Sequence, residues 1–295
     1  MTQTPFRWHR RITPWLFILP TIIGLVVFRL IPIVSSFYLS FTEWNLLRQP
    51  AFIGVGNYRE LIQSGEFTTV ALNTVQFSLL YVVGSMVLGL ALAVLIDVQI
   101  KGISFYRAAI YLPVVTSAVA VGIVWNWILG PTYGLVSNMI EAVGLSAPYW
   151  LSDPKLALNT VATLQVWKMS GYYMIIFLAG LQTINREVLE SARIDGANAL
   201  QSFFSITLPM MMPTFFFVLT ITIIDSFKNF ELIYAMTKGG PQNASNTLVY
   251  DVYLNAFVFY RVGYASAIAY ILLLFVGALT IFNFFIKKYF VYSLD

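Results

Sequence analysis

The sequence predicts an all-α polytopic membrane protein with six transmembrane helices, and three observations support this fold class. Of the 295 residues, 59% are hydrophobic and only 10% are charged, whereas soluble domains carry roughly a quarter charged residues. Several apolar runs reach the roughly 20 residues that a spanning helix needs. Basic residues gather in alternate loops between these runs. So little charge cannot cover a soluble globule, which argues against a soluble enzyme.

The apolar runs predict where the spans lie. Residues 70–96, 108–140 and 262–286 contain no charged side chain. Three further runs are similarly apolar but each contains at least one charged residue. We therefore predict spans at residues 12–38, 70–97, 108–130, 158–182, 210–236 and 264–287.

The distribution of basic residues predicts the orientation. An even number of spans places both termini on one side of the membrane. With cytoplasmic termini, nine basic residues lie inside: Arg7, Arg10, Arg11, Lys101, Arg107, Arg186, Arg193, Lys287 and Lys288. Five lie outside: Arg48, Arg59, Lys155, Lys238 and Arg261. This asymmetry follows the positive-inside rule, so we expect a multi-pass protein of the cytoplasmic (inner) membrane.

The composition also excludes several kinds of chemistry. The chain has no cysteine and only one histidine, His9. Disulfides, thiolate metal sites, histidine clusters and a Ser-His-Asp triad are therefore excluded. The sequence has no G-x-x-x-x-G-K-[ST] phosphate loop, so we expect this chain to bind no ATP or other cofactor and no metal. The net charge of +4 reports topology, and no nucleic-acid partner is expected.

One inner loop, residues 181–209, is too long and too patterned for a simple turn. Asn185 can cap a helix that carries Glu187 in its first turn, where a carboxylate favours the helix dipole. Gly196 fits the left-handed position that ends such a helix.

A second short helix is predicted to follow in the same loop. Either Asp195 or Asn198 can cap it, and Pro209 is expected to stop it before the next span. This amphipathic helix pair either rests on lipid headgroups or docks a cytoplasmic partner.

The spacing within this loop resembles a known motif. Glu-Ser-Ala at 190–192, Ile-Asp-Gly-Ala at 194–197 and Ile-Thr-Leu-Pro at 206–209 resemble the EAA loop of binding-protein-dependent ABC importers. Ser191 stands where a second alanine is usual, and Asn185 where a proline commonly precedes the loop.

Further segments carry a second resemblance. Residues 230–241, 247–248 and 263–269 are similar to the distal part of carbohydrate-importer permeases, and residues 52–58 are similar to the same subfamily. The resemblance covers the chain from about residue 14 and is most specific over 181–269. The family is the permease subunit of carbohydrate-uptake ABC importers of the maltose and glycerol-phosphate type, which implies the type I importer permease fold.

This resemblance implies a division of the chain and a set of partners. Residues 1–69 would form the N-terminal tail, first span and first outer loop, 70–287 the permease domain, and 288–295 the C-terminal tail. The expected partners are two copies of an ABC ATPase, which would bind ATP and Mg, a second homologous permease and an extracytoplasmic solute-binding protein. The residues implied to couple the permease to the ATPase are Glu187, Glu190, Ala192, Asp195, Gly196 and Ala197.

Charged residues within a predicted span are candidates for the solute pathway, because such charges are costly in lipid. Asp225, Lys228 and Glu231 recur every three residues, so neighbours can pair along one helix side. They form either an internal salt-bridge ladder or, with Asn229, the polar side of a sugar pathway.

Aromatic residues on the fourth predicted span could supply the stacking side of that pathway. Trp167, Tyr172 and Tyr173 are the candidates, although aromatic residues at such positions often serve packing alone. Lys168 is expected to pair with a carboxylate of another span, with Asp225 as one candidate.

Two other functions fit the sequence less well. A polytopic membrane enzyme would need clustered catalytic carboxylates or histidines, whereas the acidic residues here are scattered. A secondary transporter would usually show internal repeats, and none is evident. The solute stays open among disaccharides, oligosaccharides, polyols such as glucosylglycerol, and glycerol phosphate.

Overall fold

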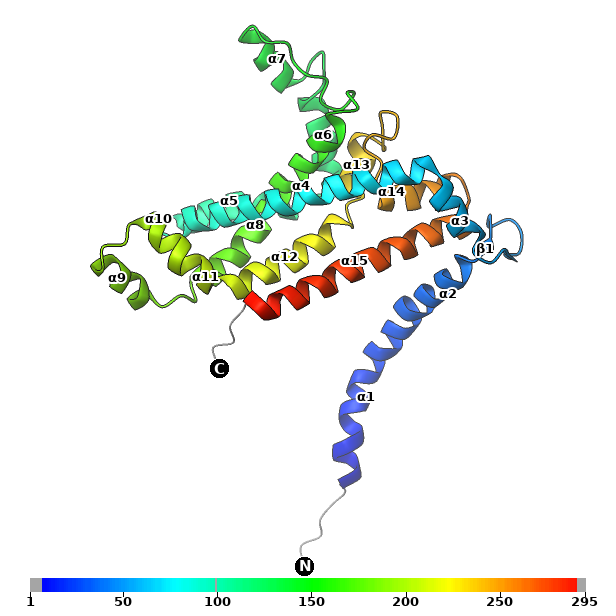
Figure 1. The fold of residues 1–295 in the computed structure, drawn as a ribbon, viewed down its shortest axis with the longest axis horizontal. Helices are drawn as coiled ribbons and strands as arrows, with labels where there is room; N and C mark the ends of the chain where they lie inside the picture. The colour runs from blue at the N-terminus through cyan, green and yellow to red at the C-terminus, as the bar shows by residue number, and fades with distance from the viewer. Residues whose placement is uncertain (1–6, 99, 291–295) are drawn as a thin grey trace, which may run out of the picture. The chain divides into compact units, whose positions relative to one another are not determined.

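The computed structural model describes residues 7–98 and 100–290, and most of the chain is helical over these ranges (Figure 1). Contacts within the chain define two compact units. The first comprises residues 1–63 and 252–270, and the second comprises residues 64–251 and 271–295. The C-terminal tail predicted at 288–295 lies largely outside the described residues.

The first unit begins with a long apolar helical run and continues into a small polar layer. Residues Pro14–Leu39 are apolar enough to cross a membrane, and no residue in their most apolar stretch is buried within the chain. Thr42 pairs with Phe52 in a two-stranded antiparallel ladder that follows this run. The elements are α1 (Arg7–Leu25), η1 (Val26–Leu30), α2 (Ile31–Leu39), β1 (Thr42–Glu43), β2 (Ala51–Phe52), α3 (Gly56–Gln63) and η3 (Leu254–Val258).

The second unit is built around the long pair α4 (Gly65–Ile96) and α8 (Ala157–Leu181), which pack against each other. Glycines permit the close approach of helices in this unit. A Cβ at Gly89 would lie 2.8 Å from the Cβ of Tyr173, and one at Gly171 would lie 2.4 Å from the carbonyl oxygen of Ile110. Small residues at such contacts are typical of packed membrane helices.

The third predicted span, 108–130, is not one straight helix. It consists of α5 (Ile103–Val115) and α6 (Ala118–Ile128), which meet at 95°. Ser117 has an extended backbone and its Oγ accepts a hydrogen bond from the N–H of Ala120, so it caps a new helix. α5 packs against α8, while α6 packs against α13 (Glu231–Met236).

The fifth predicted span, 210–236, is also broken. The helical run Ala199–Met210 is bent by 70° from α12 (Met212–Ser226), and α13 starts only after a non-helical interval. α12 packs against both α4 and α8. The remaining helices are α7 (Leu135–Ala142), α14 (Leu248–Tyr253) and α15 (Val262–Phe290).

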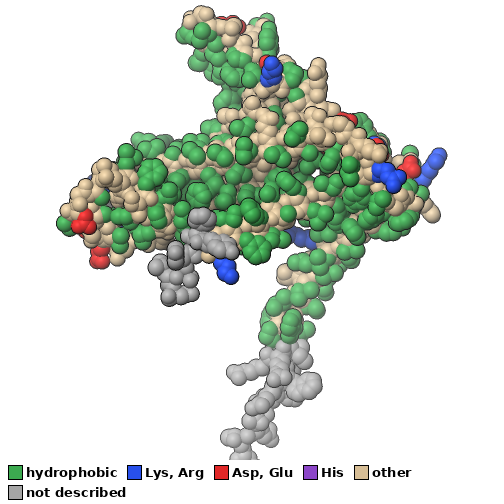
Figure 2. Space-filling view, in the orientation of Figure 1, with side chains coloured by type: hydrophobic (Ala, Val, Ile, Leu, Met, Phe, Trp, Pro, Cys, Tyr) green, Lys and Arg blue, Asp and Glu red, His purple; other side chains and the backbone are tan. Residues whose placement is uncertain are grey.

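Several of these helices can cross a membrane. Three are long and apolar enough by themselves, and up to five spans result if each bent pair counts as one. α8 corresponds to the remaining predicted span, and its 25 residues extend about 37 Å, more than the roughly 30 Å hydrocarbon core. Figure 2 shows apolar side chains covering most of the helical surface in view, with charged side chains mainly towards helix ends.

Candidate coupling loop and solute pathway

The inner loop starts with α9 (Arg186–Ile194), at the predicted position. Asn185 caps this helix, because its Oδ1 accepts a hydrogen bond from the N–H of Glu187 at 3.0 Å. Gly196 has a φ of +87°, as the predicted left-handed helix end requires. The first helix of the predicted pair is therefore confirmed.

The second helix of the loop is capped by Asn198. The Asn198 side chain accepts from the N–H of Gln201, and the Gln201 side chain accepts from the N–H of Asn198, both at 2.9 Å. This capping box starts α10 (Ala199–Ser202) and decides between the two expected caps.

Pro209 does not stop the second helix, so that expectation was wrong. The helical path continues through η2 (Phe203–Thr207) and α11 (Leu208–Met210). Pro209 occupies the first turn of α11, where its missing N–H costs little. The change of direction comes after it, at Met211.

Most of the predicted coupling residues lie on the surface of this loop. Glu187, Glu190, Asp195 and Gly196 are exposed, Ala197 is half-buried and Ala192 is buried. Apolar side chains are exposed beside them, with Ile194 86% and Leu200 71% accessible. Acidic side chains are visible in Figure 2 at the end of the molecule where α9 lies. This mixture of carboxylates and apolar groups suits a protein partner.

The candidate pathway residues lie at the break between α12 and α13. Asp225 Oδ1 is 3.7 Å from Lys228 Nζ, and the lysine side chain is 69% exposed. Within the described ranges, Lys228 makes no ion pair with Glu231, which starts the next helix. The three-charge ladder is thus reduced to one pair, because the helix ends before its third member. Asn229 Nδ2 is buried and has no hydrogen-bond partner among the described residues.

A buried tyrosine pair holds Asp225 from two other helices. The hydroxyls of Tyr81 on α4 and Tyr173 on α8 are 2.8 Å apart, and Tyr173 donates to Asp225 Oδ2 at 3.2 Å. Because Tyr173 has only one hydroxyl proton, Tyr81 acts as the donor to Tyr173. Both tyrosines are fully buried. Tyr81 was not among the predicted residues, because in a charge-free run its sequence position resembles that of an ordinary core residue.

Trp167 and Lys168 also lie on α8, but their side chains are placed differently from that of Tyr173. Trp167 is 40% exposed and packs edge-on against Trp125, with ring centroids 5.5 Å apart. Lys168 does not reach a carboxylate, contrary to expectation, and donates to the carbonyl oxygen of Val114 at 3.2 Å. That carbonyl belongs to the last turn of α5, where no intrahelical partner is available.

Comparison with known proteins identifies the family. Residues 85–291 match the family described as "Binding-protein-dependent transport system inner membrane component". The chain belongs to this family of membrane permease components.

Three curated relatives align with nearly the whole permease. The "Probable ABC transporter permease protein YesP" of Bacillus subtilis (strain 168) is 38% identical and covers 94% of this chain and 90% of that protein. The "Probable starch degradation products transport system permease protein AmyD" of Thermoanaerobacterium thermosulfurigenes is 32% identical over 93% of each chain. The "sn-glycerol-3-phosphate transport system permease protein UgpA" of Agrobacterium fabrum (strain C58) is 34% identical over 94% and 96%.

Solved structures agree with the fold. One chain of a bacterial ABC transporter for import of the acidic polysaccharide alginate superposes with a TM-score of 0.86 at 26% identity, covering 96% of the permease and 98% of that chain. A second structure, of the bacterial alginate transporter with an alginate pentasaccharide-bound periplasmic protein, gives 0.82 at 27% identity, covering 94% and 96%. The type I importer permease fold predicted from the sequence is confirmed.

The permease segment 237–248, which carried part of the sequence resemblance, forms a compact loop on α4. Asn73 Nδ2 donates to the carbonyl oxygens of Asn243 and Asn246 at 2.8 and 3.1 Å. Thr74 Oγ1 accepts from the N–H of Leu248 at 2.9 Å. These bonds hold the backbone of the loop against α4. The part of the resemblance carried by this segment is therefore explained by the structure of the loop.

Asp251, just after this loop, is a buried carboxyl group. Burial raises its pKa to about 6, an amide hydrogen bond from Asn246 lowers it, and the charge of Glu66 raises it. A carboxyl group with a raised pKa prefers its neutral form in the folded chain.

Replacing the hydroxyl of Tyr173 tests whether the tyrosine pair stabilises the helix bundle. Tyr173→Phe removes the donor to Asp225 and leaves Tyr81 without its acceptor, so we expect a loss of about 1 kcal/mol in stability. Thermal unfolding of the detergent-solubilised chain measures this loss. Tyr172→Phe is the matched control, and equal unfolding temperatures for the two variants would contradict the role of the pair.

The raised pKa of Asp251 predicts a pH-dependent stability. The stabilising contribution of the neutral carboxyl is complete below its unfolded pKa of about 4 and is lost as pH rises through about 6. Asp251→Asn should therefore unfold at a higher temperature than the wild type at pH 8 and at a similar temperature at pH 4. Thermal unfolding across this range is the measurement, with exposed Asp97→Asn as control. A constant difference at every pH contradicts the prediction.

Proposed function

We propose that this permease carries a sugar or sugar-like solute into the cell across the cytoplasmic membrane, driven by ATP hydrolysis on a separate subunit. The observation that carries the proposal is the capped, exposed helix pair of residues 185–207 in a chain of this family. ATP and Mg would be held by two ATPase copies, because this sequence has no phosphate loop of its own.

The geometry of the loop supports a mechanical link to those ATPases. Asn185 and Asn198 fix the starts of both helices, while Gly196 sets the turn between them. The loop then runs as one helical path into the bend before α12, whose far end carries Asp225. A movement imposed on α9 would therefore reach the candidate pathway through connected helices.

A second permease and an extracytoplasmic solute-binding protein complete the proposed assembly. The binding protein is supported by the alginate importer, whose structure was solved with its solute-bound periplasmic protein. The outer loops 41–69, 131–157 and 237–263 are the proposed landing surfaces. The charge asymmetry of the sequence supports their placement outside, with both termini in the cytoplasm.

The solute class follows from the relatives and from the pathway chemistry. The relatives are named for starch degradation products and sn-glycerol-3-phosphate, and the solved importer for alginate. Asp225, Lys228 and Asn229 would supply polar groups, Glu231 a further carboxylate and Trp167 an aromatic face. Disaccharides, oligosaccharides, polyols such as glucosylglycerol and glycerol phosphate all fit this set.

Engineered cysteines test the proposed orientation. The chain has no cysteine, so a membrane-impermeant thiol reagent gives no background. We expect exposed Tyr133→Cys to be labelled on intact cells and Ser191→Cys, on α9, only after permeabilisation. The opposite pattern would reverse the topology.

Two substitutions test the coupling role of the loop. Glu190→Lys reverses an exposed charge, and Gly196→Val places a β-branched side chain at a φ of +87°. Neither change lies in a predicted span, so both variants should insert normally. We expect both to lose solute uptake, by tenfold or more, together with ATPase association.

Matched controls separate coupling from general damage. Glu141→Lys makes the same charge reversal on α7, far from the loop in sequence, and should retain ATPase association. Asp225→Asn should retain association and change uptake alone. Normal uptake and assembly in Glu190→Lys and Gly196→Val would show that the loop is a passive interfacial helix pair.

A further inference from the structure

A polar cavity of about 300 Å³ lies within the first unit, and none of its lining residues is assigned to the pathway or the coupling loop. It is formed where the sequence segments 52–58 and 263–269 meet, and most of its lining belongs to two of the outer loops proposed above as landing surfaces. Its lining includes Trp44, Asn57, Glu60 and Arg261. In the proposed topology it opens on the outer side of the membrane.

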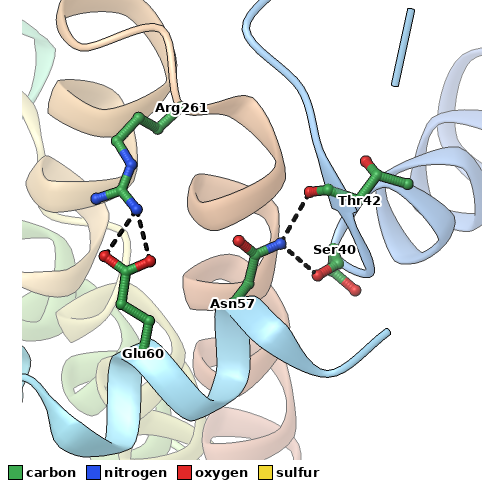
Figure 3. Close-up of polar contacts among 5 residues, drawn as sticks. All are labelled: Ser40, Thr42, Asn57, Glu60 and Arg261. Carbon is green, nitrogen blue, oxygen red and sulfur yellow. Dashed lines mark hydrogen bonds and ion pairs between the residues drawn. The ribbon is translucent and has the colours of Figure 1, made fainter. Parts of the chain in front are cut away.

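The frame of the cavity is held together by hydrogen bonds to backbone carbonyl oxygens and by one close backbone contact. Asn57 is buried and its Nδ2 donates to the carbonyl oxygens of Ser40 and Thr42 at 2.8 and 2.9 Å (Figure 3). The N–H of Val262 donates to the carbonyl oxygen of Trp44 at 2.9 Å. A Cβ at Gly263 would lie only 1.9 Å from the carbonyl oxygen of Thr42, so only glycine fits there.

Polar groups converge inside this frame. Arg261 Nη2 donates to both carboxylate oxygens of Glu60 at 2.7 Å, and both side chains are about half exposed. Figure 3 shows the Asn57 Oδ1 directed towards the side where this ion pair lies. An exposed ion pair contributes little to stability. We therefore interpret the pair as hydrogen-bond donors and acceptors that are held in position on the cavity lining.

Aromatic rings provide the other half of the lining. Trp44, Tyr260 and Tyr264 border the cavity, and the Arg261 guanidinium lies 4.3 Å from the Tyr264 ring centroid. Tyr260 is 55% exposed and has a φ of +54°, a left-handed conformation that is uncommon for an aromatic residue. The left-handed turn at Tyr260 ends η3, because the N–H of Arg261 donates to the carbonyl oxygen of Asn255 at 2.7 Å across it, and the Tyr260 ring lines the cavity just after this turn.

The charges of the lining select among solutes. The cavity carries the carboxylates of Glu43 and Glu60 and the single guanidinium of Arg261, so its formal charge is negative. An anion would be repelled, whereas a neutral ring with hydroxyl groups can bond the polar groups and stack its apolar face on the aromatic rings. We propose that this cavity binds a neutral sugar or polyol on the outer side of the membrane.

Saturation-transfer NMR on the full chain in lipid nanodiscs tests the proposal. The probes are maltose, which is neutral, and sn-glycerol 3-phosphate, which is anionic. We expect transfer to maltose and little to sn-glycerol 3-phosphate. Trp44→Ala keeps the backbone carbonyl that bonds Val262, and we expect it to weaken maltose binding about tenfold.

Tyr260→Gly separates binding from folding. Glycine relieves the left-handed strain, so the unfolding temperature should be unchanged or higher while maltose binding falls. Exposed Tyr133→Ala is the control and should bind maltose normally. The measurement uses neither ATPase nor ATP, so its failure leaves the importer assignment standing.

Three results would overturn the proposal. They are no transfer to maltose, equal transfer to the two probes, and unchanged maltose binding in both Trp44→Ala and Tyr260→Gly. If these two variants bound maltose normally, but the assembled importer that contains them lost the stimulation of ATP hydrolysis by a solute-binding protein, the cavity would be a contact for that protein instead.

Discussion

Backbone polar groups inside a bilayer must find partners within the protein, and this constraint organises the permease. Long helices such as α4 meet it along their whole length, because each backbone N–H bonds to a carbonyl oxygen one turn earlier in the same helix. The two broken spans meet it differently. At the first break, the carbonyl oxygen of Val114 is left by the end of α5 and accepts from Lys168. At the second, Asp225, Lys228 and Asn229 gather where α12 stops. The charged and amide side chains named here thus lie or reach where helices are interrupted.

The hydrogen bonds from Tyr81 through Tyr173 to Asp225 connect α4, α8 and the last turn of α12, just before the second break. A carboxylate at a helix end could otherwise turn freely with its side chain. Here Oδ2 is held by a buried hydroxyl, and Oδ1 is left to the half-exposed pairing with Lys228. α12 follows the inner loop through one bend of 70° at Met211, so the hydrogen-bonded residues and the loop belong to consecutive helical segments.

Local signals allowed the inner loop to be predicted, whereas tertiary contacts decided the breaks. Asn185 and Gly196 act through bonds and torsions within a few residues, so their sequence positions were sufficient. Pro209 misled the prediction because a proline in the first turn of a helix is tolerated and does not end it. The break after Ser226 and the capture of Lys168 by Val114 depend on packing between distant segments, which hydropathy does not report. Tyr81 has no sequence signal that separates it from its apolar neighbours.

The outer cavity likewise combines residues that the sequence resemblance identifies with residues that it does not. Asn57 and Gly263 lie in segments that carried the sequence resemblance, and the local structure accounts for both. Asn57 donates to two carbonyl oxygens, and the site of Gly263 has no room for a Cβ. Trp44 and Tyr260 lie outside those segments, although they supply the aromatic lining. Sequence resemblance identifies the fold readily, while the solute has to be inferred from the charges and rings that the frame holds.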